Sequence, residues 1–98
     1  MRMASSTPST IRFAIWGPIE RDDVPGLSDR VCGLLRHSGA TLALCDVTGV
    51  GADAVTVDAL ARLQLAARRH QCLIRLRGAS QELSGLIAFM GLEDVLAP

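Results

Sequence analysis

The spacing of large apolar residues changes several times along the chain, as it does where strands alternate with helices. From Ile11 to Ile15 every second residue is a large apolar one, which predicts a first strand that ends at Gly17-Pro18. Between residues 24 and 38 the apolar side chains instead fall on one helical face, and Gly39 is placed to end that helix. The first third of the chain is therefore a strand followed by a helix.

The rest of the chain repeats this alternation. The apolar run Thr41–Val47 predicts a strand buried on both faces, and an apolar stripe predicts a helix from about Ala54 to His70. Residues 73–77 resemble a third strand, Ser80 is a natural N-cap for a third helix, and residues 92–96 should pack on the core. This order predicts one α/β domain with three helices and a mostly parallel sheet of four strands or fewer.

Composition narrows the possible functions. Residues 1–10 are rich in Ser, Thr and Pro, which predicts a flexible tail before a domain at 11–98. Ten basic and ten acidic residues cancel without long runs of either sign, which argues against a nucleic-acid partner. No apolar run approaches the roughly 20 residues of a membrane-spanning helix, and no signal peptide is visible. We therefore expect a cytoplasmic protein without direct membrane insertion.

Residues with catalytic or metal-binding chemistry are few and scattered. Cys32, Cys45 and Cys72 lie in apolar segments and show no C-x-x-C spacing, so we expect buried reduced thiols and no metal site. Asp46 and Asp53 flank the central loop and could act as acid and base, but Asp is also the residue that turns and helix caps use. The sequence thus predicts a protein that is not an enzyme and holds no cofactor.

Three short segments carry a family resemblance. Asp46–Val50 follows the second predicted strand, Asp53–Thr56 opens the second helix, and Met90–Leu96 closes the third. In order and spacing they resemble the Asp-Leu-Ser-Gly-Val stretch, the Asp-Ser-Ser-Gly loop and the Gly-Leu-x-x-Val/Ile-Leu ending of STAS domains (sulphate transporter and anti-sigma factor antagonist). The resemblance covers about residues 11–96 and implies a STAS-like fold that acts as a protein-interaction module.

In its anti-sigma factor antagonist branch, the resemblance implies that the partner is a kinase-type anti-sigma factor. There a Ser or Thr at the start of the second helix is phosphorylated, and the added charge abolishes binding. Counting forward from Val50 places Thr56 at the acceptor, whereas aligning back from the helix places Val55 there. Thr56 is therefore the candidate phosphoacceptor, and its other interpretation is a first-turn helix residue that faces the core.

A second branch of the family works without phosphorylation. Its small STAS subunits bind the ATPase of a lipid-transporting ABC system, and a Thr near the start of the same helix takes part in the contact. Under either branch the predicted partner-binding surface includes an Asp58–Arg62 ion pair and an outward Leu65 on the polar side of the helix. The full predicted surface consists of Asp53, Ala54, Val55, Thr56, Val57, Asp58, Arg62 and Leu65.

Overall fold

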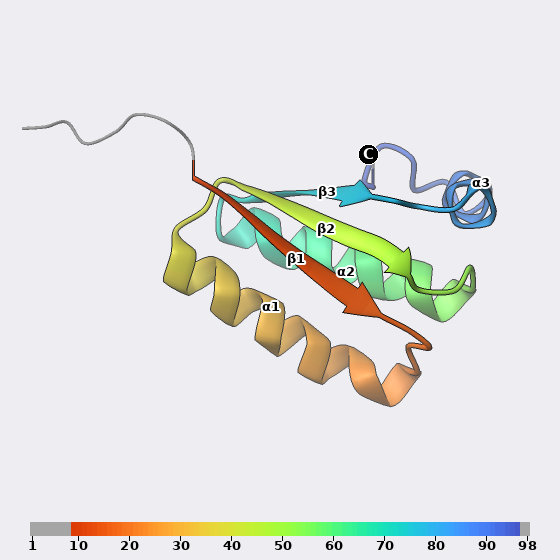
Figure 1. Cartoon of the computed structure of the whole chain (residues 1–98), viewed down its shortest axis with the longest axis horizontal. Helices are drawn as coiled ribbons and strands as arrows, with labels where there is room; N and C mark the ends of the chain where they lie inside the picture. The colour runs from red at the N-terminus through yellow and green to blue at the C-terminus, as the bar shows by residue number, and fades with distance from the viewer. Residues whose placement is uncertain (1–8, 97–98) are drawn as a thin grey trace, which may run out of the picture.

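A computed structural model describes residues 9–96 as a parallel sheet with helices on one of its faces (Figure 1). The three strands lie in the order β1-β2-β3, and α1 and α2 pack against each other behind them. No helix in the described part of the chain is long and apolar enough to cross a membrane. The elements are β1 (Thr10–Trp16), η1 (Arg21–Asp23), α1 (Val24–Ser38), β2 (Leu42–Gly49), α2 (Ala54–Arg69), β3 (Leu73–Arg77) and α3 (Gln81–Phe89).

Local signals in the sequence set the ends of the helices. Gly39 adopts the left-handed conformation, with φ of 62°, and its N–H bonds to Leu35 O to close α1. Ser80 caps α3 by accepting a hydrogen bond from Leu83 N at 3.0 Å. The predicted α/β architecture with three helices is therefore confirmed, together with the bounds of α1.

Some predicted boundaries differ by a few residues. Thr10, which the sequence analysis placed in the tail, is the first residue of β1, and residues 1–8 of that predicted tail lie outside the described residues. The second strand continues past Val47 to Gly49, because Gly17 N donates to Gly49 O at 2.9 Å and extends the pairing of β1 with β2. The short η1 turn before α1 was not predicted.

The prediction that β2 is buried on both faces is wrong. Its side chains alternate between buried, as at Cys45 and Val47, and exposed, as at Asp46. The strand order explains this: two successive right-handed crossovers in one direction place α1 and α2 on the same face. The other face of the sheet is left open to solvent.

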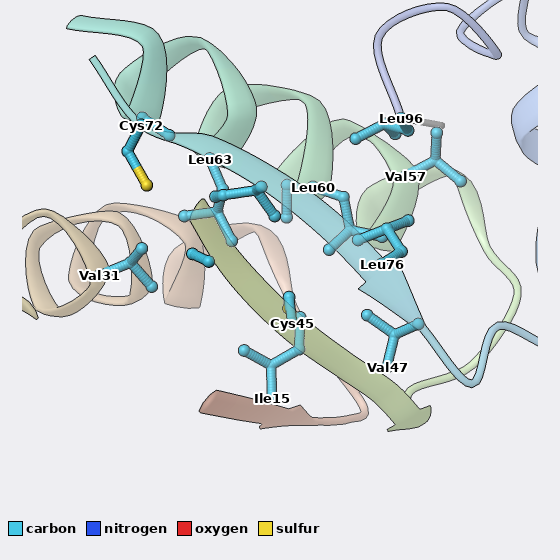
Figure 2. Packing of buried hydrophobic residues seen from close by; sticks show 14 of the residues in the cluster. Ile15, Val31, Cys45, Val47, Val57, Leu60, Leu63, Cys72, Leu76 and Leu96 are labelled. Carbon is cyan, nitrogen blue, oxygen red and sulfur yellow. The ribbon is translucent and has the colours of Figure 1, made fainter. Parts of the chain in front are cut away.

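The core lies between the sheet and the two long helices (Figure 2). Cys45 and Val47 of β2 point toward Leu60 and Leu63 of α2, and Leu96 of the final segment closes the far side. The burial of Leu96, at 3% exposure, confirms that the last apolar segment packs on the core. Each buried Leu of this kind stabilises the fold by about 1.5–3 kcal/mol relative to an exposed position.

A buried amide fastens the outer edge of β3. Gln64 is 1% exposed, and its Nε2 donates to Ile74 O at 2.7 Å while its Oε1 accepts from Ile74 N at 2.9 Å. The same Nε2 also donates to Val95 O at 3.0 Å. One side chain of α2 therefore satisfies both backbone groups of a strand residue and holds the C-terminal segment against the sheet.

Candidate functional site

Hydrogen bonds to a carboxylate brace the last residues of β2, where the register with β1 shifts. Thr48 N donates to Asp46 Oδ1 at 2.9 Å, and both residues belong to β2. The side-chain and backbone hydrogen bonds from Thr48 lower the pKa of Asp46 from its usual 3.8. Asp46 therefore braces the end of the strand and keeps its negative charge on the open face of the sheet.

Asp53 is the N-cap of α2. Its Oδ1 accepts a hydrogen bond from Thr56 N at 2.8 Å, and its backbone is extended, as an N-cap requires. The carboxylate is exposed and lies at the positive end of the helix dipole. The acidic residue at the start of this loop is thus occupied in beginning the helix.

Thr56 and Val57 face the interior and not the predicted partner surface. Both are fully buried, at 0% exposure. The Thr56 hydroxyl makes no hydrogen bond to any part of the chain that the structure describes. In this conformation a kinase cannot reach the Thr56 hydroxyl, and the geometry matches the interpretation of Thr56 as a first-turn core residue.

The exposed residues of the predicted surface gather along a groove between two helices. Two adjoining hollows, of about 460 and 390 Å³, share Val24, Pro25 and Arg62 in their walls. We call this surface the α1–α2 groove. Its walls are formed by Val24, Pro25 and Ser28 of α1, Ala54, Val55, Asp58, Arg62, Leu65, Ala66 and Arg69 of α2, and the neighbouring Arg21 and Met90.

The chemistry of the α1–α2 groove is mixed. Leu65 is 53% exposed, and half-buried Val24 and Val55 add apolar surface. The predicted ion pair is present, with Arg62 Nε 2.8 Å from Asp58 Oδ2. Both groups of this pair are exposed, so it orients the two side chains more than it stabilises the fold.

The structure thus divides the predicted surface. Ala54, Val55, Asp58, Arg62 and Leu65 line the α1–α2 groove, whereas Thr56, Val57 and Asp53 are not among the residues that line it. Val24 and Pro25 were not predicted to line a site, because residues 24–38 were interpreted only as a helix. Met90, which reaches the groove from the end of α3, was not predicted there either. No local signal in the sequence shows that these three residues adjoin α2.

Cys45 and Cys72 are buried as expected, whereas Cys32 is only half-buried. Burial, and then the charge of Asp46, raises the pKa of Cys45 to about 12. Burial also raises the pKa of Cys72, and all three cysteines are free. Among residues 9–96 no group of three His, Cys, Asp or Glu side chains could hold a metal ion.

Comparison with known families gives one match. A family model described as "Mlab, STAS domain" matches residues 3–98, nearly the whole chain. No curated protein matches the chain.

Proposed function

The chain belongs to the STAS domain family, and we propose that it is a non-catalytic module that binds a partner protein in the α1–α2 groove. The observation that carries this proposal is the gathering of Ala54, Val55, Asp58, Arg62 and Leu65 along one groove. STAS domains act in protein-protein interactions, and a groove between helices offers a partner both apolar contact and charged groups.

The partner that we propose is a kinase-type anti-sigma factor, as in the antagonist branch of the family. The groove carries Arg21, Arg62 and Arg69 against a single carboxylate, Asp58, which already pairs with Arg62. A complementary partner segment would present carboxylates beside an apolar side chain that packs on Leu65. Such charges at a rim mainly raise the association rate and the specificity.

We further propose that binding is not switched at Thr56 while α2 is intact. The buried hydroxyl of Thr56 would become accessible only if the first turn of the helix opened. The preceding segment 49–55 contains no Ser or Thr that could replace it. Binding would then depend on the amounts of the two proteins and not on a phosphate at this loop.

The burial of the Thr56 hydroxyl also supports a second candidate partner, the ATPase of an ABC transport system. STAS subunits of that kind need no phosphoacceptor, and here segment 49–55 contains no Ser or Thr while Thr56 is buried. In this case the contact would also run through the α1–α2 groove, because Thr56 is not at the surface.

The test is an affinity purification from the native host with wild-type protein, Leu65→Glu and Leu34→Glu. The two leucines are similarly exposed, at 53% and 48%, but only Leu65 lines the groove. We expect Leu65→Glu to lose the partner and Leu34→Glu to keep it. Mass spectrometry then identifies the partner as an anti-sigma factor or as an ABC ATPase.

Equal recovery of the partner by all three proteins would refute the groove as the binding surface. Recovery of a peptide phosphorylated at Thr56 would show that the first turn of α2 opens, and would restore the switch hypothesis. Nucleotide hydrolysis by the purified protein would contradict the proposal that the chain is not an enzyme.

A further inference from the structure

The outer edge of β1 carries unused backbone groups. Ser9 O and Gly17 N both bond toward β2, so the odd-numbered residues between them face β2. Backbone groups of successive residues in a strand point to opposite edges. The N–H and C=O groups that point outward therefore belong to Thr10, Arg12, Ala14 and Trp16, and nothing within residues 9–96 bonds to them.

This edge lacks the protection found at the opposite edge of the sheet. At β3, Gln64 satisfies both backbone groups of Ile74, and the C-terminal segment is fastened beside it. β1 has seven residues and contains one charge, Arg12, and no Pro or Lys. Natural proteins usually shield a strand edge of this kind, or use it for pairing.

We propose that two copies of the chain pair through the outer edges of their β1 strands, antiparallel and about a twofold axis at Phe13. Each outward-facing residue then exchanges both of its backbone hydrogen bonds with the second copy. Arg12 lies opposite Ala14 of the second copy, and Thr10 lies opposite Trp16. This register avoids placing Arg12 against itself, as an axis at Arg12 would do.

Charges on the open face favour the same register. Ala14 of β1 is the cross-strand neighbour of Asp46 of β2. Only the small Ala14 side chain therefore lies between Asp46 and the outer edge of the sheet. In the paired sheet Arg12 of one copy lies about 10 Å, or two strand spacings, from Asp46 of the other. The long Arg12 side chain can cross Ala14 to reach the exposed Asp46 carboxylate, which also lies beside Arg77 in the register of β2 and β3. The twofold axis produces this contact twice.

The other face of the strand adds apolar contact. A hollow of about 540 Å³ adjoins the end of β1 and is lined by Ile15, Ile19 and Leu27 among others. In the proposed register Ile11 of the second copy lies opposite Ile15, at the wall of this hollow. Ile11 and Phe13 are only partly buried in one copy, and pairing would cover both.

This dimer is independent of the proposed function, because no β1 residue lines the α1–α2 groove. The test is sedimentation equilibrium of the full chain over a range of concentrations, where we expect a monomer–dimer equilibrium. Ala14→Pro should weaken it roughly tenfold to hundredfold, since it removes one outward donor from each copy. The N–H of Ala14 has no partner within residues 9–96, so the monomer should still fold, as circular dichroism would verify.

A charge swap tests the register itself. Arg12→Asp and Asp46→Arg should each weaken dimerisation roughly tenfold, and the double variant should recover most of the loss. Arg36→Asp, on exposed α1 surface, is the matched control and should change nothing. A wild-type chain that stays monomeric at every concentration would overturn the proposal. Dimerisation that Ala14→Pro leaves intact, or single-variant losses that the double variant fails to recover, would also overturn it.

Discussion

Replacement of Thr56 by Val should stabilise the protein, although Thr56 occupies the position that the family resemblance makes a candidate acceptor. The Thr56 hydroxyl is fully buried and makes no hydrogen bond within residues 9–96. Burial of an unpaired hydroxyl costs about 1–3 kcal/mol. Val has the same branched shape, and the bond that caps the helix uses the backbone N–H of Thr56, which the variant keeps. We therefore expect a gain of about 1–2 kcal/mol in the free energy of unfolding.

Urea unfolding measures this change directly. The midpoint should rise without a change in slope, and the melting temperature should rise by about 4–8 °C per kcal/mol. Thr56→Ser keeps the hydroxyl and loses a buried methyl group, so it should be destabilised by about 1 kcal/mol. If Thr56→Val is instead less stable than wild type, then the hydroxyl has a partner in solution, and its classification as an unsatisfied core group is wrong.

The same burial changes how a phosphomimetic variant must be interpreted. Thr56→Glu would place a carboxylate among core residues, at a cost of several kcal/mol. A domain of this size is stable by only about 5–15 kcal/mol, so the variant could lose binding through unfolding alone. Thr56→Val also lacks the hydroxyl but should stay folded. If it keeps binding while Thr56→Glu loses it, the loss does not come from the missing hydroxyl.

Three further experiments test other contacts of the fold. Gln64→Leu leaves the buried backbone groups of Ile74 unpaired, so the free energy of unfolding in urea should fall by about 3 kcal/mol or more. A fall of less than about 1 kcal/mol would contradict this role of Gln64. Asp53→Ala removes the helix cap and should cost about 1 kcal/mol in the same assay, whereas Asp53→Asn should keep most of the stability. Burial raises the pKa of Cys45 to about 12. At pH 8 a disulfide reagent should therefore label half-buried Cys32 first and Cys45 only on unfolding. Fast labelling of Cys45 in the folded protein would refute its burial.

The sequence predicted those features that depend on residues close together in the chain. Gly39 and Ser80 act on neighbouring residues, so their roles as helix ends could be predicted from the sequence alone. The burial of Thr56 agrees with one of the two interpretations that the sequence left open, that of a first-turn residue facing the core. The open face of the sheet could not be predicted from the apolar run of β2, because it depends on the direction of both crossovers.

The candidate site was harder to predict than the fold for the same reason. Asp58, Arg62 and Leu65 recur along one side of α2, so their periodicity indicated a common surface. The opposite wall of the groove comes from Val24 and Pro25, which are thirty or more residues earlier in the chain. Only the packing of α1 on α2 brings the two walls together.

The acidic residue of the loop does not by itself indicate a phosphorylation switch. Asp53 is fully accounted for by the helix cap, a role that α2 needs whether or not a hydroxyl follows. Ala54 and Val55, the next two residues, carry no hydroxyl, and the hydroxyl of Thr56 points into the core. The part of the motif that begins the helix is therefore present without an accessible acceptor. Under the proposed function, partner choice depends on the exposed side chains of the α1–α2 groove.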